Sequence, residues 1–220
     1  MTVSISEEVQ NDFPSLHVLT SCIERVTVKK FDSKLEAFKE SVIQEIRSTY
    51  EIETLKDRPI LRAYRDFFWK LGVDPTKTRP AAEALIRRLL RGRNLPRINT
   101  LVDAYNLASI KTEIAIAAFD FDKIRGELEM RYAEPKEEFL GIGMKTPLQL
   151  NGREIVISDE EKLVAVYPYR DAEDTKVTEA TRSVLLLFCG VPGISTKKLS
   201  EAKNVTLDFV TKFCGGVLKE

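Results

Sequence analysis

The chain has 220 residues with 34 basic and 34 acidic side chains, so its net charge of zero indicates no class of partner by itself. Apolar residues make up 43% and charged residues 31%, a balance that supports a buried core and argues against a disordered or collagen-like chain. A single histidine, His17, and three cysteines without metal-like spacing exclude a histidine-rich zinc site. We therefore expect no metal and no cofactor.

The sequence also bears on location. No apolar stretch approaches the ~18 residues that a membrane-spanning helix needs. Residues 1–8 lack the basic start and apolar run of a signal peptide. The three cysteines imply no disulfide framework, and Cys189 follows an apolar run typical of a buried position. These features predict a cytoplasmic protein.

The first half of the chain is predicted to be mostly helical. Residues 16–28 alternate loosely and predict a strand, after which Asp32 or Ser33 can cap a helix. Four helices are predicted from periodicity, capping residues, prolines and glycines: residues 33–50, 59–72, 80–92 and 100–112. Asn99 or Thr100 can cap the last of these four helices.

The second half changes to strand-like periodicity. Short apolar segments punctuated by glycines predict six strands: residues 114–118, 128–130, 139–142, 155–157, 164–167 and 184–188. A last helix is predicted from Ser195 to Cys214, with two glycines as its stop. Helices, then strands, then a helix indicate an α+β fold. We expect a mostly antiparallel sheet flanked by helices, with residues 1–94 as an N-terminal extension packed on residues 95–220 in one compact unit.

Residues 77–97 form the clearest charge asymmetry, with Glu83 as their one acidic residue. The basic residues of this segment are Lys77, Arg79, Arg87, Arg88, Arg91, Arg93 and Arg97. On a helix, Arg87, Arg88 and Arg91 share a face. Such a face can neutralise nucleic-acid phosphates, so the six arginines are RNA-binding candidates. The alternative is a solvated helix surface balanced by acidic residues elsewhere.

Two further segments are candidate ligand contacts. On the predicted helix 100–112, Asp103 and Asn106 share one polar face, which either meets solvent or lets Asn106 contact a substrate. The stretch 163–181 runs from an apolar strand into polar side chains of several kinds: Tyr167, Tyr169, Arg170, Asp171, Thr175, Thr178 and Thr181. A plain connecting loop needs turn formers rather than so many hydrogen-bonding groups. Threonine hydroxyls suit holding a water or an ester carbonyl, so we favour a pocket, although Thr178 can equally cap a short helix.

Several short blocks occur in an order and spacing that are more specific than any one of them. They are residues 102–105 (VDAY), 118–120 (AFD), Arg131, 150–154 (LNGRE), 163–166 (LVAV), 177–181 (VTEAT) and 184–186 (VLL). From Leu95 to about Phe188 the chain thereby resembles the B3/B4 domain of the phenylalanyl-tRNA synthetase beta subunit. Residues 1–94 and 195–220, with 167–171 (YPYRD), are similar to free-standing B3/B4 proteins, which have no synthetase attached.

This resemblance implies a B3/B4-type fold and an editing activity on tRNA. In the synthetase, the domain hydrolyses tyrosine wrongly esterified to phenylalanine tRNA, with a water oriented by hydrogen bonds and by the substrate's ribose hydroxyl rather than by a covalent nucleophile. The residues that the resemblance and the polar stretch together assign as catalytic are Glu154, Thr178, Thr181 and Arg170. Those assigned to the amino-acid moiety are Asn106, Tyr167, Tyr169, Asp171 and Thr175.

Two positions depart from the bacterial pattern. The histidine that precedes the "AFD" block is Ala117 here, and the asparagine of the first block is Ala104. The leading hypothesis is a deacylase that acts in trans on a mischarged tRNA. A binding module for tRNA or an amino acid without turnover, and an unrelated small-molecule hydrolase on the same fold, are the alternatives.

Overall fold

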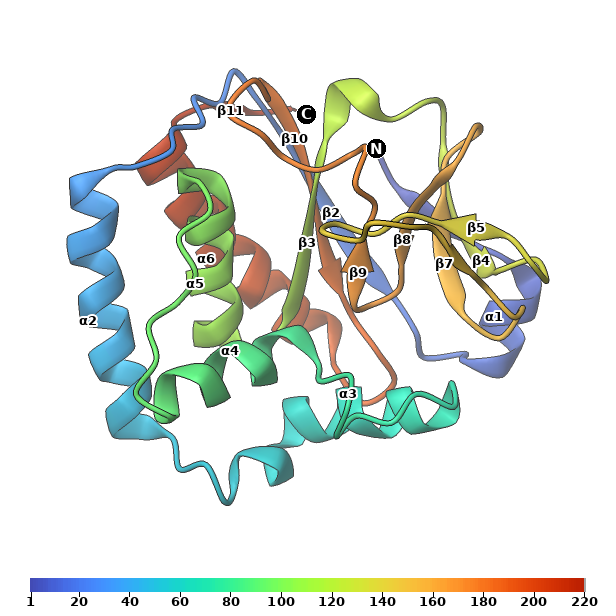
Figure 1. Cartoon of the computed structure of the whole chain (residues 1–220), viewed down its shortest axis with the longest axis horizontal. Helices are drawn as coiled ribbons and strands as arrows, with labels where there is room; N and C mark the ends of the chain where they lie inside the picture. The colour runs from blue at the N-terminus through green and yellow to red at the C-terminus, as the bar shows by residue number, and fades with distance from the viewer. Residues whose placement is uncertain (220) are drawn as a thin grey trace.

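A four-stranded antiparallel sheet stands at the centre of the protein in the computed structural model, which describes residues 1–219 (Figure 1). Its strand order is β11-β2-β10-β3. The strands are β2 (Val18–Glu24), β3 (Ala115–Asp120), β10 (Ser183–Cys189) and β11 (Val217–Leu218). All residues of β3 and nearly all of β10 are buried, which explains why both are continuous apolar runs rather than alternating ones.

A second sheet of five strands lies beside the first, in the order β1-β4-β7-β8-β9 (Figure 1). Its strands are β1 (Val3–Ile5), β4 (Leu128–Tyr132), β7 (Ile155–Ser158), β8 (Leu163–Val166) and β9 (Arg170–Asp171). Only the β1–β4 pair is parallel, and the two-stranded ribbon of β5 (Glu138–Phe139) and β6 (Leu148–Gln149) is antiparallel. The predicted α+β fold with mostly antiparallel strands is therefore confirmed.

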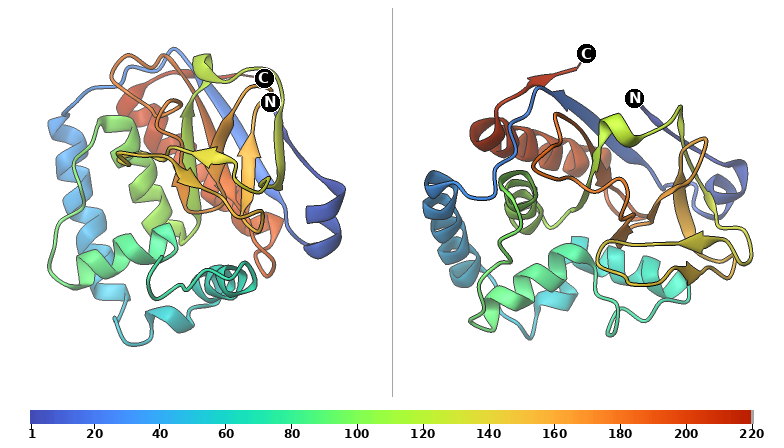
Figure 2. Two further views of the ribbon diagram at one scale, coloured as in Figure 1. Left: turned by 45° about the vertical axis from the view of Figure 1, so that its right-hand side comes forward. Right: turned by 45° about the horizontal axis from the view of Figure 1, so that its top comes forward.

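Six α-helices surround these sheets: α1 (Glu7–Asp12), α2 (Ser33–Thr49), α3 (Pro59–Lys70), α4 (Ala81–Leu90), α5 (Thr100–Thr112) and α6 (Thr196–Cys214). Two 3₁₀ turns, η1 (Leu55–Asp57) and η2 (Phe121–Lys123), complete the described elements. In both views of Figure 2, α2, α5 and α6 lie on the side of the central sheet away from the five-stranded sheet. The predicted N-caps at Asp32, Asn99 and Ser195 are confirmed by side-chain hydrogen bonds to the first helical turn.

Several local predictions differ from the structure. The strand expected over 16–28 is limited to β2. Of the expected strand 139–142, only Phe139 belongs to a strand, β5, while Gly141 forms an isolated bridge with Ala172. Strand β1 and helix α1 were not predicted from the sequence, because three- and six-residue elements carry little periodicity. Strand β9 was not predicted either. Because β8 and β9 pair as a hairpin, Tyr167 and Tyr169 occupy its turn rather than one face of a strand.

The two sheets share one apolar core and meet along the free edge of β3. There the backbone N–H of Asp120 donates to the carbonyl of Thr175 at 2.8 Å, and Phe119 forms a bridge with Lys176. Strand β2, from the first part of the chain, is an inner strand of the central sheet. The division at residue 94 stays a prediction.

Candidate functional site

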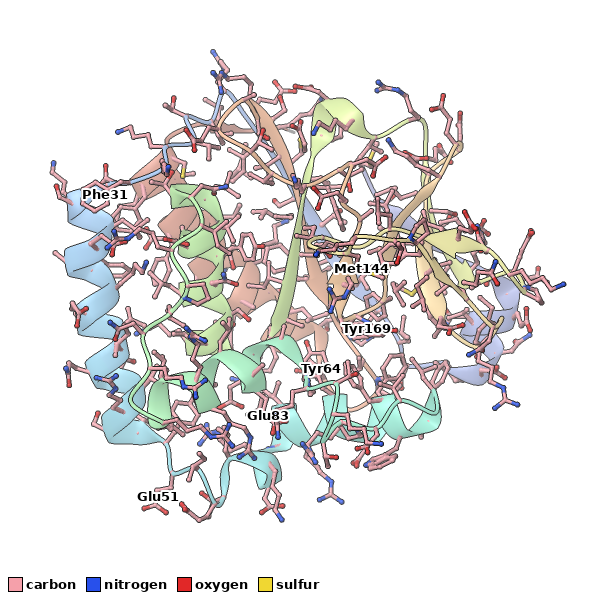
Figure 3. All side chains as sticks on the ribbon, in the orientation of Figure 1. Phe31, Glu51, Tyr64, Glu83, Met144 and Tyr169 are labelled. Atoms are coloured by element: carbon pink, nitrogen blue, oxygen red, sulfur yellow. The ribbon has the colours of Figure 1, made fainter. Side chains whose placement is uncertain are left out.

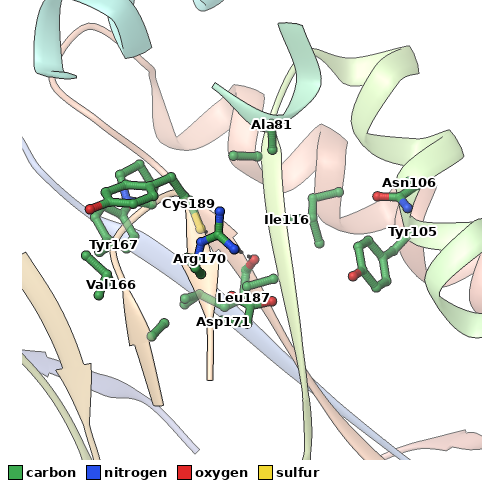
Figure 4. Close-up of a pocket in the computed structure, with 15 residues that line it drawn as sticks. Ala81, Tyr105, Asn106, Ile116, Val166, Tyr167, Arg170, Asp171, Leu187 and Cys189 are labelled. Atoms are coloured by element: carbon green, nitrogen blue, oxygen red, sulfur yellow. Dashed lines mark hydrogen bonds between the residues drawn. The ribbon is translucent and has the colours of Figure 1, made fainter. Parts of the chain in front are cut away.

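A cavity of about 160 Å³ lies where the β8–β9 hairpin meets β3, β10 and the helices α4 and α5 (Figure 4). Four alanines on its wall create this space, because each leaves a methyl group where a larger side chain would fill the gap: Ala81, Ala115, Ala117 and Ala165. Ile116, Val166 and Leu187 make another part of the wall apolar. The cavity therefore has a largely apolar lining with a few polar groups that project into it, as ligand pockets commonly do.

Three polar side chains of this lining lack a side-chain hydrogen-bond partner within residues 1–219. They are Tyr105 and Asn106 on α5 and Asp171 on β9. In Figure 4, Tyr105 and Asn106 point from α5 toward β3, and Asp171 lies on the far side of that strand. All three are partly exposed, so water or a ligand in the cavity can reach them.

Asp171 is the acidic member of the set. Burial raises the pKa of its carboxyl to about 7, while the backbone N–H of Ala118 and the charge of Arg170 act in the opposite direction. The pKa of the Tyr105 phenol is raised by burial and then by the charges of Asp171 and Asp103, so this hydroxyl stays neutral. Asp171 and Tyr105 are thus close enough to affect each other across the cavity.

Arg170 lies at the edge of the same cavity and forms no salt bridge with any acid among the described residues. Its Nη1 donates to the carbonyl of Ile142 at 3.2 Å. The stem of Arg170 passes over Gly141, where an added Cβ would lie 2.3 Å from Cδ of the arginine. Glycine at position 141 is therefore what lets the side chain take this path.

The two tyrosines of the hairpin turn frame the cavity in different ways. Tyr167 is fully buried, and its hydroxyl donates to the carbonyl of Gly190. Tyr169 is half-buried and packs edge-on against Phe68 with ring centroids 5.8 Å apart. The structure thus brings five of the predicted site residues to one cavity: Asn106, Tyr167, Tyr169, Arg170 and Asp171.

The other four predicted pocket residues lie outside this lining. Thr181 donates to Asp120 Oδ2 at 2.7 Å and accepts from the backbone N–H of Thr178 at 2.9 Å, which fastens this loop to the end of β3. Thr175 is fully buried with no partner for its hydroxyl within residues 1–219. Glu154 accepts from the backbone N–H of Asn151 at 3.0 Å. Their roles in catalysis or binding stay predictions.

Tyr105 is a polar residue of the cavity that was not selected from the sequence. Its signal was present, because Tyr105 ends the VDAY block and precedes Asn106. Ala117, the position matched to the bacterial histidine, also lies on the cavity wall, whereas Ala104 does not. The resemblance therefore pointed to two lining positions, Tyr105 and Ala117, that the choice of residues by polarity left out.

A second hollow, of about 400 Å³, carries the basic segment. Its charged lining residues are Lys77, Arg79, Arg87, Arg88, Arg91 and Arg93. Arg97 is not in this lining; it donates to Glu36 at 2.9 Å and lies over the ring of Phe31. Five of the six predicted RNA-binding arginines thus face one hollow, joined by Lys77.

The charges of this basic hollow are not all available. Arg87 and Arg65 contact the fully buried Glu83 at 2.7 and 3.1 Å, so part of the positive charge stabilises α4 against α3. Figure 3 shows Glu83 between these helices. The remaining five basic side chains form no salt bridge within residues 1–219: Lys77, Arg79, Arg88, Arg91 and Arg93. A dense set of cations without acids repels itself unless an anion binds there.

Helix α4 connects the cavity to the basic hollow. Ala81 lines the cavity, while Ala84, Leu85 and Arg88 line the hollow. Ala84, Leu85 and Arg88 lie three, four and seven residues after Ala81. Residues at these spacings share one face of a helix. The helix rises about 10 Å from Ala81 to Arg88 along this face.

Within residues 1–219, no group of three or more histidine, cysteine, aspartate or glutamate side chains is placed to hold a metal ion. The three cysteines are buried and unpaired by disulfides.

No helix in the described part of the chain is long and apolar enough to cross a membrane.

Comparison with known proteins identifies the family. The B3/4 domain family model matches residues 63–218, more than half of the chain. The chain therefore belongs to the B3/4 domain family. This match includes all of α4 and every residue that lines the cavity and the basic hollow.

The similar curated proteins are phenylalanine–tRNA ligase beta subunits. That of Francisella tularensis is 30% identical over 97 residues, which is 44% of this chain and 12% of the relative. That of Symbiobacterium thermophilum is 27% identical over 129 residues, 58% of this chain and 14% of the relative. The chain thus corresponds to a small part of these relatives.

A solved structure shares the fold. The crystal structure of an N-terminal fragment of the phenylalanyl-tRNA synthetase beta subunit from Pyrococcus horikoshii matches with a TM-score of 0.53 and 16% sequence identity. The match covers 99% of this chain and 50% of the fragment. At this identity the likeness supports the arrangement of elements and not the identity of site residues.

Proposed function

We propose that this protein binds the aminoacylated 3′ end of a tRNA and hydrolyses the aminoacyl ester in trans. The observation that carries the proposal is the shared face of α4, which runs from a small cavity into a hollow of unpaired cations. A nucleic acid whose phosphates occupy the basic hollow can extend its terminus along this face of α4 into the cavity. Membership of the B3/4 family and the tRNA ligase relatives support tRNA as that nucleic acid. A cytoplasmic location belongs to the same proposal.

The cavity suits an aminoacyl group. A volume of about 160 Å³ compares with a cavity of ~150 Å³ that binds one benzene molecule in another protein. The site thus has room for one small or single-ring side chain, and its lining offers both apolar contact and polar groups for orientation. Ala117 changes the wall at the position matched to a bacterial histidine, which favours an amino acid other than tyrosine.

Hydrolysis at this site needs a positioned water and no covalent intermediate. The water oxygen attacks the ester carbonyl carbon, the bond to the ribose oxygen breaks, and a water proton passes to that oxygen, releasing the amino acid and the tRNA. Tyr105 and Asn106 can orient the water or the ester, and Arg170 can stabilise the negative charge that develops on the carbonyl oxygen. His17 is outside the cavity lining, so no histidine base is assigned.

The test is an assay of ester loss on a panel of mischarged tRNAs. We expect turnover of at least one aminoacyl-tRNA and a fall of about 10²-fold or more in Arg170→Ala, since removing a group that stabilises an oxyanion has that order of effect. Arg153→Ala is the matched control, because Arg153 is exposed and outside the cavity. Turnover unchanged by Arg170→Ala would remove Arg170 from the mechanism.

Binding without turnover is the second candidate function. It is favoured by one specific observation: Ala117 leaves the cavity wall without the ionisable side chain that the resemblance places there. Salt-sensitive binding of aminoacyl-tRNA with a stable ester would support this candidate over hydrolysis.

A further inference from the structure

The carboxyl group of Asp171 is the acidic group of the cavity lining, and no side chain in the described part of the chain forms a salt bridge with it. Arg170 is its neighbour in sequence, yet the guanidinium of Arg170 donates to the carbonyl of Ile142 instead. A partly exposed carboxylate that lines an apolar cavity without a cation still carries a desolvation cost. Elsewhere Glu83 offsets this cost by contacts with Arg65 and Arg87, and Asp120 by accepting a hydrogen bond from Thr181. The missing cation is therefore expected from the ligand.

We propose that Asp171 binds the free ammonium group of the amino acid in this cavity, so that the site accepts esters with a free amine and rejects N-acylated ones. This inference rests on the proposed function and goes further, because it names which chemical form of the aminoacyl group is recognised. The class it excludes includes peptidyl-tRNA and other esters whose amine is blocked by an acyl group.

Three polar side chains of the lining can supply the acceptors that an ammonium group needs. An ammonium has three N–H donors and no acceptor. Asp171 offers carboxylate oxygens, Asn106 an amide oxygen, and Tyr105 a phenol oxygen, all on the same lining. Tyr105 and Asp171 line the same cavity, and the charge of Asp171 adds to burial in raising the pKa of the Tyr105 phenol. One cation can thus satisfy groups on both α5 and β9.

Acylation of the amine removes each of these advantages. It abolishes the positive charge and leaves one N–H donor, so the carboxyl group of Asp171 keeps its desolvation cost without a counter-charge. The acyl group also needs room in a cavity sized for a single ring. A site built to bind a polar group rejects analogues that lack it by up to about 10⁴–10⁵-fold.

The experiment compares paired ligands on the full chain. Each tRNA is prepared with an aminoacyl ester whose amine is either free or N-acetylated, and these esters report hydrolysis. The same pair is prepared with a 3′-amide linkage, which resists hydrolysis and reports binding alone. We expect the free amine to be favoured by about 100-fold or more in binding or turnover. Asp171→Asn should bring the ratio close to one while the protein remains folded by thermal denaturation.

Asp174→Asn provides the matched control. Asp174 is exposed, contacts Lys162 at 2.9 Å, and lies outside the cavity lining, so its variant should keep the preference of the parent protein. Equal handling of free and acetylated ligands by the parent protein, or an unchanged preference in Asp171→Asn, would overturn this inference and leave the proposed function standing. No binding or turnover of any aminoacyl-tRNA would overturn both.

Discussion

Buried acids are treated differently in the helical region and at the cavity wall. Around α4 and α5, Glu83 contacts two arginines, and Asp103 accepts from Lys39 Nζ at 3.0 Å and from the backbone N–H of Ile98 at 3.0 Å. Lys39 itself has only 6% of its side chain exposed. On β9, by contrast, Asp171 has no side-chain partner within residues 1–219 and a pKa raised to about 7.

This contrast separates structural charges from functional ones. In the helical region each of these buried acids contacts a basic side chain. The main effect of these ion pairs is to fix how the helices pack. At the cavity the carboxyl group of Asp171 has no basic partner, which lowers the stability of the folded protein. Such a destabilising group is typical of a site where a ligand binds it. The comparison therefore predicts opposite results for mutations in the two regions.

The largest effect is expected from breaking a matched pair. Lys39→Met keeps most of the apolar stem but leaves Asp103 buried without its cation, and should lower the free energy of unfolding by about 3–5 kcal/mol. Urea denaturation measures this decrease. Lys111→Met is the control, because Lys111 and Glu45 form an exposed pair at 2.6 Å whose removal should cost about 1 kcal/mol or less. Similar decreases in both variants would contradict the distinction.

Thr181 tests whether the closing loop belongs to the framework or to the chemistry. Thr181→Val keeps the shape but removes the hydrogen bonds to Asp120 and from Thr178, and should lower the free energy of unfolding by about 1–3 kcal/mol. If the role is structural, kcat for ester hydrolysis stays within a few-fold of the parent at a temperature where the variant is folded. A fall in kcat of about 100-fold or more would support the catalytic role predicted from the resemblance.

Much of the fold could be predicted from the sequence, because capping residues and prolines mark where the helices begin. Asp32, Asn99 and Ser195 cap helices where side-chain chemistry requires it, and Pro59 begins α3. The short elements β1, β9 and α1 were not predictable in this way, since they depend on partners distant in sequence. Val3, for example, pairs with Leu128.

The cavity was only partly predictable for a related reason. Arg170, Asp171 and Asn106 could be selected as polar residues next to apolar runs, but their meeting depends on the contact of β9 with β3. Polarity alone cannot distinguish Asp171, which faces a cavity, from Thr181, which binds Asp120. Ala81 and Ala115 carry no chemical signal at all, although their small size creates the space.

The unmatched carboxyl should also make stability depend on pH. The pKa of Asp171 is about 7 in the folded protein against an ordinary 3.8, so Asp171 lowers stability progressively as pH rises from about 4 to about 7. Asp171→Asn should therefore raise the melting temperature at pH 8 and leave it nearly unchanged at pH 4. Because the side chain is partly accessible, we expect on the order of 1 kcal/mol, or roughly 2–4 °C. A melting temperature lowered by the substitution at pH 8 would mean that Asp171 has a stabilising partner.

The smallest effects on the folded protein are expected in the basic hollow, where exposed cations contact no acid. Arg91→Ala and Arg93→Ala should leave the free energy of unfolding within about 0.5 kcal/mol of the parent. Each should weaken tRNA binding and reduce the slope of log K against log salt by about 0.7–0.9 for each phosphate that the variant no longer neutralises. Lys198→Ala is the control, because Lys198 is on α6 and contacts Glu201 at 2.7 Å. A salt slope that all three variants share with the parent would mean that the hollow does not bind phosphates. A reduced slope confined to the Arg91 and Arg93 variants would show that the unmatched charge of the hollow serves a ligand.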